Sequence, residues 1–389
     1  LGKVLKPLKK PTEAYKIKVL DMACGSGSFL LRSFDLLDEW YQKHDKDYAQ
    51  SKLELETNAA KMTKKALNLK TNIFGVDLDP KAVEITQLNL LLRAAETRYR
   101  LPNLMNNIKF GNSLISQSLT PEMYPMEWNK EFSEIMSDGG FDVVIGNPPY
   151  VRQEEFLDIK PYLERNYEVY HSMADLYVYF FERELKVLKE GGYFGMIVSN
   201  KWLKAGYGKR LRKFIDKYYI DQFIDFGDLP VFQDATTYPC IIIIKKIMKK
   251  NPKMKVCLVN DLNFQDLNKY VIDNHFTLNQ SDLNEESWNF NSREVIGLLD
   301  KIKKRNQPLY KYINNDIYRG ILTGMNEAFV INQTIRDQLI AKEPQSAELI
   351  KPYLTGKEVR PYQIDYKNKY IILTKNGIDI TKYPAIMDW

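Results

Sequence analysis

The sequence predicts an α/β protein with a Rossmann-like, mostly parallel sheet. Short apolar runs that are typical of buried strands alternate with longer segments that are typical of amphipathic helices. A glycine-rich turn at 25–27 follows the first apolar run, and an Asn-Pro-Pro-Tyr turn at 147–150 follows the fourth. Ligands of such sheets bind outside the carboxyl ends of the strands, so we expect both turns at one ligand-binding edge.

Seven strands are expected, and the last should be antiparallel. The chain between the sixth and seventh strands leaves no room for a crossover helix, which favours antiparallel pairing. The seventh is also the longest apolar block of the chain and ends in two lysines. The expected strands cover residues 17–21, 73–77, 108–110, 141–145, 193–198, 223–226 and 240–244.

Four segments between these strands are expected to be helical. They include a helix that runs to about residue 40, a polar insertion at 41–70, and residues 174–189. The best-marked helix starts at Asp79-Pro80, because aspartate caps helices and proline suits the first helical position. This helix, over 81–98, is expected to turn five apolar side chains toward a core: Val83, Ile85, Leu88, Leu91 and Leu92.

The chain is expected to divide into a main domain at 1–250, a linker at 251–307, and a second domain at 308–389. The linker is predicted because the strand–helix alternation stops and asparagines become frequent. The chain opens at Leu1 instead of methionine, and it stops at Trp389 shortly after a strand-like run. Both ends look cut, so we expect an excised piece of a longer protein with an incomplete second domain.

Composition narrows the class of protein. Of the 389 residues 44% are apolar, and no apolar run reaches the ~18 residues of a membrane span. Three cysteines and three histidines lack the spacing of a metal site or a disulfide framework, so we expect a cytoplasmic protein with no metal. The net charge is +6, and residues 291–389 hold 16 Lys/Arg against 11 Asp/Glu. This excess suits nucleic acid, although an ordinary solvated basic face explains it equally well.

The polar residues at the ends of the first three strands suit a nucleoside without phosphates. The turn at 25–27 lacks the third glycine of dinucleotide-binding proteins and the Gly-Lys-Ser/Thr ending of a phosphate cradle. Asp21 ends the first strand and Asp77 ends the second, where a carboxylate can bind both ribose hydroxyls. Asn112 follows the third strand and can bind an adenine edge. S-adenosylmethionine fits this set, although Asp77 could be a helix cap and Asn112 a turn residue.

The turn at 147–150 is suited to holding a planar amine. The Asn147 side-chain oxygen and the Pro148 carbonyl are both acceptors, and proline has no amide hydrogen with which to satisfy them. An aromatic ring at Tyr150 can stack on the flat group that carries the amine. The sequence therefore predicts a site where an exocyclic –NH2 group attacks an electrophile.

These motifs together resemble the amino-group DNA methyltransferases. The segments at 21–30, 75–80 and 147–150 are similar to the motifs of adenine-specific enzymes of the TaqI type, in the order of the gamma class. The resemblance implies a seven-stranded methyltransferase sheet and a site-specific DNA adenine methyltransferase of a restriction-modification system. It also implies that residues 308–389 begin a target-recognition domain, because 323–329 and 353–358 resemble its opening.

The resemblance assigns residues to two sites. A motif that packs beneath the cofactor pocket is placed at 175–177. Phe232 takes the position of the aromatic ring that stacks on the flipped base. The implied catalytic residues are Asn147, Pro148, Pro149, Tyr150 and Phe232, and the implied cofactor-binding residues are Asp21, Ala23, Cys24, Gly25, Gly27, Phe29, Asp77, Leu78, Asn112 and Ser113.

The chain departs from this family in two places. Asn112 stands where the family usually has aspartate, and no Phe/Tyr-x-x-Pro cofactor motif precedes Asp21. No nuclease motif with paired carboxylates and a lysine stands out, so a nuclease domain or subunit would lie outside this fragment. The recognition sequence is not readable from these residues, because specificity rests on base-edge contacts.

Three other functions share parts of this pattern. Enzymes that methylate a glutamine of release factors use the same turn, since glutamine also presents a planar amine. RNA guanine methylation and a non-catalytic DNA-binding subunit are further alternatives. The long basic region after the last strand favours DNA over the protein substrate.

The remaining aromatic and basic candidates are weaker. Arg152 and Lys201 follow strand ends and could contact DNA phosphates or simply be solvated. Arg319 is a better candidate for a DNA contact. Four aromatic residues of one predicted helix are expected in the core and not under a base: Tyr177, Tyr179, Phe180 and Phe181.

Overall fold

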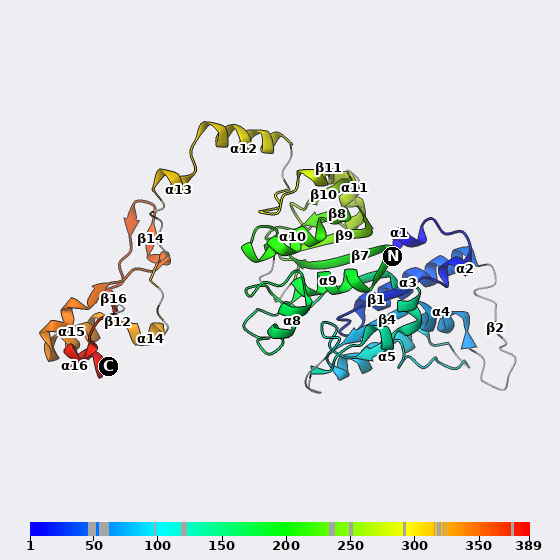
Figure 1. Ribbon diagram of the computed structural model, residues 1–389, viewed down its shortest axis with the longest axis horizontal. Coiled ribbons are helices and arrows are strands. Elements are labelled where there is room, and N and C mark those ends of the chain that lie inside the picture. The colour runs from blue at the N-terminus through cyan, green and yellow to red at the C-terminus, as the bar shows by residue number, and fades with distance from the viewer. Residues whose placement is uncertain are drawn as a thin grey trace. The chain divides into compact units, whose positions relative to one another are not determined.

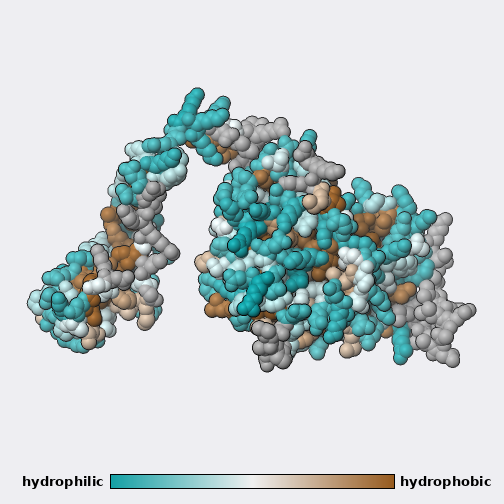
Figure 2. Space-filling view, in the orientation of Figure 1, coloured by the Kyte–Doolittle hydropathy of each residue, from teal (hydrophilic) through white to brown (hydrophobic). Residues whose placement is uncertain are grey.

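The protein forms two compact units, residues 1–296 and 297–389, in a computed structural model (Figure 1). No helix among the described residues is long and apolar enough to cross a membrane, and the face of the first unit drawn in Figure 2 is mostly hydrophilic. The structure describes residues 1–45, 52–53, 62–96, 99–117, 123–232, 238–248, 252–290, 293–314, 316, 320–321, 323, 325–374 and 377–389.

The first unit is built on a nine-stranded sheet in the order β11-β10-β8-β9-β7-β6-β1-β4-β5. β1 pairs in parallel with β4 on one side and with β6 on the other. β9 is antiparallel to both β7 and β8, so the seven predicted strands and the antiparallel last strand are confirmed. Their bounds are β1 Val19–Asp21, β4 Ile73–Asp77, β5 Ile108–Phe110, β6 Phe141–Gly146, β7 Leu188–Ser199, β8 Tyr218–Asp225 and β9 Pro239–Met248.

Two further strands extend the sheet where a linker was predicted over 251–307. β10 (Lys253–Leu258) pairs in parallel with β8, and β11 (Phe276–Asn279) pairs antiparallel with β10. In β10, exposed lysines alternate with the fully buried Met254 and Val256, so one face of this strand continues the core beside β8. The linker prediction was wrong here because the period-two pattern is short and is embedded in asparagine-rich loops.

The strands are buried on both faces, and their side chains contribute alternately to two separate hydrophobic cores. Val19 belongs to the core beneath α3, α4 and α5, and its neighbour Leu20 belongs to the core beneath α9. Ile73 and Phe74 of β4 repeat this alternation. Figure 1 shows α3–α5 in blue to cyan beside β1 and β4, and α9 in green beside β7. The helix bounds are α1 Gly2–Leu5, α2 Pro11–Ala14, α3 Ser28–His44, α4 Lys64–Asn72, α5 Pro80–Ala94, α6 Trp128–Glu131, α7 Ser133–Ser137, α8 Lys160–Asn166, α9 Tyr177–Val187, α10 Lys209–Ile215 and α11 Leu267–Asn274.

α5 has its predicted start but not its predicted core face. The Asp79 carboxylate accepts a hydrogen bond of 2.9 Å from a backbone amide of the first turn, as a helix cap does. Ile85, Leu88 and Leu92 are exposed, so their predicted burial was wrong. The helix is rotated because its inner side packs on the glycine-rich loop and on α3. That inner side consists of Val83, Thr86, Leu90 and Ala94.

The polar insertion predicted as helical at 41–70 is only partly so. α3 continues to its end at residue 44, and α4 starts after Thr63, whose hydroxyl accepts a cap hydrogen bond of 3.1 Å. Between these helices, β2 (Lys52–Leu53) and β3 (Met62–Thr63) pair antiparallel. Residues 46–51 and 54–61 of this prediction lie outside the described part of the chain.

The second unit has a small apolar core of its own. Its three-stranded antiparallel sheet has the order β12-β16-β13, and α15 packs against it. Ile331, Ile350 and Ile372 are buried there. The elements are α12 Arg293–Arg305 (which begins just before this unit), α13 Leu309–Tyr312, α14 Asn326–Phe329, β12 Val330–Asn332, α15 Gln333–Lys342, β13 Ile350–Pro352, the pair β14 Val359–Arg360 and β15 Gln363–Ile364, β16 Lys369–Ile372, and α16 Pro384–Met387.

Candidate active site

A cavity of about 670 Å³ lies at the carboxyl ends of β1, β4, β5 and β6. This is the edge at which the sequence places both turns, and the structure brings most of the predicted residues together there. Predicted residues that line the cavity are Ala23, Gly25, Asp77, Leu78, Asn112, Ser113, Asn147 and Pro149. Predicted residues that do not line it are Asp21, Cys24, Gly27, Phe29, Pro148, Tyr150 and Phe232.

The glycine-rich loop is shaped to pack against α5. Gly25 and Gly27 have φ angles of +54° and +86°, which residues other than glycine rarely adopt. A Cβ atom on Gly27 would lie 2.9 Å from the Thr86 methyl carbon. The Thr86 hydroxyl donates a hydrogen bond of 2.7 Å to the Gly25 carbonyl. Gly27 therefore serves the close approach of loop and helix, while Gly25 faces the cavity.

Asp77 holds two loops of the site together. Its Oδ2 atom accepts a hydrogen bond of 2.8 Å from the Gly25 amide, and its Oδ1 atom accepts one of 2.9 Å from the Asp79 amide. Each carboxylate oxygen has a second lone pair, so the side chain can still accept hydroxyl donors from the cavity. The structural role of Asp77 and the predicted ribose contact are compatible.

Asp21 lies behind the cavity wall in a buried acidic pair. Its Oδ1 atom accepts a hydrogen bond of 3.0 Å from the Ala23 amide. A Cβ atom on Gly146 would lie 3.4 Å both from Asp21 Oδ1 and from Glu184 Oε1, so the two carboxyl groups flank the residue before the catalytic turn. Burial, with a contribution from Asp77, raises the pKa of Asp21 to about 7, and burial next to Asp21 raises the pKa of Glu184 well above its usual range.

Cys24 and Phe29 both lie outside the cavity lining. Cys24 is buried, and its sulfur would lie 3.2 Å from a Cβ atom on Gly75 in β4. Burial also raises the pKa of the Cys24 thiol. Phe29 is 41% exposed at the start of α3, outside the cavity lining.

The loop after β5 is held by hydrogen bonds of Asn112 and Ser113, which the sequence singled out, and of Trp128, which it did not. Asn112 lines the cavity, but its Oδ1 atom also accepts a hydrogen bond of 3.1 Å from the Leu114 amide, as a turn residue does. The Ser113 hydroxyl donates to the Met22 carbonyl at 2.6 Å, which joins this loop to the end of β1. Trp128 Nε1 donates to the Ser113 carbonyl at 3.2 Å.

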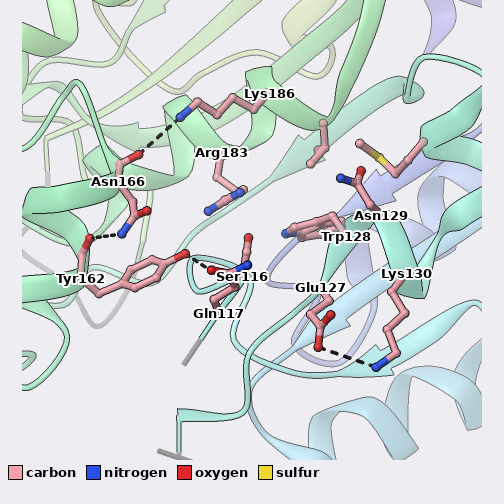
Figure 3. A pocket seen from close by; sticks show the side chains of 12 residues that line it. Ser116, Gln117, Glu127, Trp128, Asn129, Lys130, Tyr162, Asn166, Arg183 and Lys186 are labelled. Atoms are coloured by element: carbon pink, nitrogen blue, oxygen red, sulfur yellow. Dashed lines mark hydrogen bonds and ion pairs between the residues drawn. The ribbon is translucent and has the colours of Figure 1, made fainter. Parts of the chain in front are cut away.

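Figure 3 shows a second cavity, of about 580 Å³, which is lined in part by Ser116 and Gln117 of the chain after β5. The Tyr162 hydroxyl accepts a hydrogen bond of 2.9 Å from the Ser116 amide. Arg183 Nη2 donates to the Leu114 carbonyl at 3.2 Å, and its Nε atom donates to the Tyr167 hydroxyl at 3.0 Å. These side chains come from the regions of α8 and α9, so the packing of two helices sets the position of the cofactor-side loop.

The turn at 147–150, which the sequence predicts to be catalytic, leaves one polar atom without a partner. The Asn147 Oδ1 atom is buried and has no hydrogen-bond partner among the described residues. Buried acceptors are normally paired, so such an atom suggests a ligand that completes the site. The Tyr150 ring lies beside the rings of Phe232 and Tyr177, with centroid distances of 6.4 Å and 6.3 Å. Burial raises the pKa of the Tyr150 hydroxyl, which stays protonated at neutral pH.

The segment after this turn forms a wall of the cavity that sequence reasoning missed. The only feature of the sequence that could have indicated this segment is its position directly after the turn at 147–150. Phe180 of α9 also lines the cavity, in addition to being buried with the other aromatic residues of that helix, as predicted. Leu176, from the motif predicted at 175–177 to pack beneath the cofactor pocket, also lines the cavity. The lining residues that were not predicted include Val151, Glu155, Phe156, Asp158, Ile159 and Phe180.

The predicted phosphate contacts are less well defined. Arg152 and Lys201 are both exposed, which suits a DNA contact and a solvated side chain alike. Arg319 and Gly324 of the C-terminal motif lie outside the described part of the chain.

Comparison with known proteins finds one family model that is similar to the part of the chain containing this site. Residues 71–232 match the model of the Eco57I restriction-modification methylase family, and they include Asp77, the catalytic turn and Phe232. This segment of the chain is therefore similar to that family. This confirms the predicted relationship to methyltransferases of restriction-modification systems.

Two curated relatives extend the match beyond the Eco57I-type segment. The type II restriction enzyme and methyltransferase RM.Eco57I of Escherichia coli is 29% identical over 83% of this chain and 34% of its own length. The type II methyltransferase M.BstVI of Geobacillus stearothermophilus is 28% identical over 78% of this chain and 57% of its own length. The chain thus spans between a third and three fifths of these relatives.

A solved structure supports the fold. The type IIL restriction-modification enzyme MmeI, determined in complex with DNA, resembles this chain with a TM-score of 0.57 at 13% identity. The match covers 98% of this chain and 48% of that protein. It supports the α/β fold of this chain.

Proposed function

We propose that this chain transfers a methyl group from S-adenosylmethionine to the exocyclic amine of an adenine in DNA. It would do so as the modification part of a restriction-modification system. The observation that carries this proposal is the buried, unpartnered Asn147 Oδ1 atom beside a nucleoside-sized cavity. A donor –NH2 group in the position of an adenine amine would satisfy that acceptor.

The cavity fits the proposed cofactor. No lysine or arginine is among its lining residues in the described chain, which argues against a cofactor with phosphates. Asp77 would hold the ribose hydroxyls, and Asn112 and Phe180 would contact the adenine. S-adenosylmethionine supplies a methyl group on a positively charged sulfur, which is electrophilic enough to be attacked by an amine.

The catalytic turn would act chiefly by orientation. Asn147 Oδ1 and the Pro148 carbonyl would accept the two amine hydrogens and so draw the nitrogen toward a tetrahedral, nucleophilic geometry. Adenine must first leave the duplex, which costs a few kcal/mol. Stacking on Tyr150 and Phe232 would return about 1–3 kcal/mol for each ring.

The second unit is proposed to begin the target-recognition domain. It is a separate compact unit with its own core, and it lies in the basic C-terminal part of the chain. The two curated relatives named above are, by name, a type II restriction enzyme and methyltransferase and a type II methyltransferase. DNA is therefore favoured over a protein glutamine or RNA as the substrate.

A methyl-transfer assay tests the proposal against its alternatives. Tritium-labelled S-adenosylmethionine is incubated with the protein and, separately, with duplex genomic DNA, recombinant release factor or transfer RNA. Label in DNA, recovered as N6-methyladenine after digestion, is the expected result. Label in release factor or RNA alone, or as methylcytosine in DNA, would overturn the proposal.

A further inference from the structure

The cofactor cavity is bordered by an unusual number of carboxylates. Asp77, Asp79, Glu155 and Asp158 all line it, and the described lining contains no lysine, arginine or histidine to balance them. Two of these carboxylates come from the edge of β4 and the start of α5. The other two come from the segment that directly follows the catalytic turn. The field inside the cavity is therefore negative.

The first two carboxylates have clear structural roles. Asp77 accepts hydrogen bonds from two backbone amides, and Asp79 caps α5. Glu155 and Asp158 differ, because the structure shows no hydrogen bond or ion pair to either carboxylate within the chain it describes. Folding alone does not explain why two uncompensated negative charges face the same cavity.

The backbone around these two residues is firmly anchored. Phe156 and Ile159 are buried, so the side chains that alternate with them stay at the cavity rim. The Phe156 ring lies against the Tyr179 ring with a centroid distance of 6.2 Å. At the start of the segment, the Val151 carbonyl accepts a hydrogen bond of 3.0 Å from the Leu176 amide. The two carboxylates are thus presented by a fixed wall.

We propose that Glu155 and Asp158 form an acidic rim that makes the site prefer the cationic methyl donor to its demethylated product. This inference rests on the proposed function. S-adenosylmethionine carries a sulfonium, an ammonium and one carboxylate, so its net charge is positive at neutral pH. S-adenosylhomocysteine has lost the sulfonium charge together with the methyl group and is neutral overall. A negative rim attracts the donor and not the product, which favours product release after each transfer.

The effect should be modest for each residue, because both carboxylates are exposed and screened by water and salt. Isothermal titration calorimetry of Glu155→Gln, Asp158→Asn and the double variant would measure it with S-adenosylmethionine and S-adenosylhomocysteine. We expect each single variant to bind the donor about two- to four-fold more weakly, and the double variant about four- to ten-fold. Product affinity should change less than about two-fold. The difference should shrink in high salt.

Glu154→Gln is the matched control. Glu154 is the exposed neighbour of Glu155, loses the same charge on substitution, lies outside the cavity lining, and already accepts a hydrogen bond of 2.6 Å from Gln153. It should leave the ratio of donor to product affinity unchanged. Sinefungin is an analogue of similar size that carries a protonated amine in place of the methyl sulfonium. Because it is also cationic at this position, it should behave as the donor does.

Two outcomes would overturn the acidic rim. Equal losses for donor and product would show that the two residues act through packing. An equal loss in Glu154→Gln would show a general effect of net charge. If the unsubstituted protein bound neither donor nor product, the proposed cofactor itself would be wrong, which is a separate and visible failure.

Discussion

The two loops that meet at the cavity differ in how their polar atoms are satisfied. At the glycine-rich loop, the carboxylate of Asp77 and the hydroxyl of Thr86 are bonded to backbone atoms of the loop itself. At the catalytic turn, the Asn147 acceptor is buried and unpartnered. The difference fits the proposed function, in which the protein itself completes the loop on the cofactor side and the turn at 147–150 keeps one acceptor for the substrate. Four predictions would break or sharpen this contrast.

The largest effect is expected at the catalytic turn. Asn147→Ala removes the unpartnered acceptor and should lower methyl transfer by about 10²- to 10³-fold or more, by analogy with the loss of one oriented hydrogen-bonding group. Cofactor affinity and the melting temperature should hardly change, because no hydrogen bond within the protein is lost. Tritium transfer and calorimetry measure the two quantities. Asn166→Ala, at an exposed asparagine of α8, is the control, and full activity of Asn147→Ala would refute the assigned role.

On the cofactor side, the expected losses are in stability. Gly27→Ala combines a φ angle of +86° with a Cβ contact of 2.9 Å to Thr86, so it should lower the free energy of unfolding by about 2–4 kcal/mol. Gly25→Ala has φ +54° and no atom within 4 Å, so its cost should be only about 1 kcal/mol. Urea denaturation would compare them. Equal losses would mean that the contact with α5 is unimportant.

The buried pair of carboxyl groups predicts a pH dependence of stability. Asp21 binds its proton more tightly in the folded chain, with a pKa of about 7, than in the unfolded chain, with a value of 3.8. The free energy of unfolding therefore falls as the pH rises from about 4 to 7. Asp21→Asn should flatten this slope by up to about 1.4 kcal/mol per pH unit. Unfolding titrations at pH 5, 6 and 7 test it, and Glu84→Gln, an exposed change on α5, should leave the slope as it is.

The smallest effect is expected behind the loop after β5. Arg183→Met removes the hydrogen bonds to the Leu114 carbonyl and the Tyr167 hydroxyl, so the loop should loosen and cofactor affinity should fall about three- to ten-fold. Lys130→Met is the control within the same second cavity. Its side chain is 72% exposed and pairs with Glu127 at 3.7 Å, so affinity should stay within about two-fold. If both variants had the same cofactor affinity in calorimetric titrations, Arg183 would not support the loop after β5.

Much of the site could be predicted because its parts are local. A strand end followed by glycines, an aspartate before a proline, and Asn-Pro-Pro-Tyr each carry their conformation and chemistry in a few adjacent residues. The predicted burial of Ile85 and Leu88 failed for the opposite reason. Apolar spacing on a helix marks a stripe, but the neighbour that covers a stripe is set by the tertiary fold. Here the Thr86 side faces the glycine-rich loop.

The sequence by itself determined seven of the nine strands of the large sheet, the glycine-rich loop and the turn at 147–150, because short-range stereochemistry dictates them. Only the tertiary structure decided which distant residues complete the site. It set Glu184 against Asp21 across Gly146, brought Arg183 behind Leu114, and made the segment around Glu155 a wall of the cavity. These contacts depend on how helices pack on a twisted sheet, and no local pattern of residues encodes that packing.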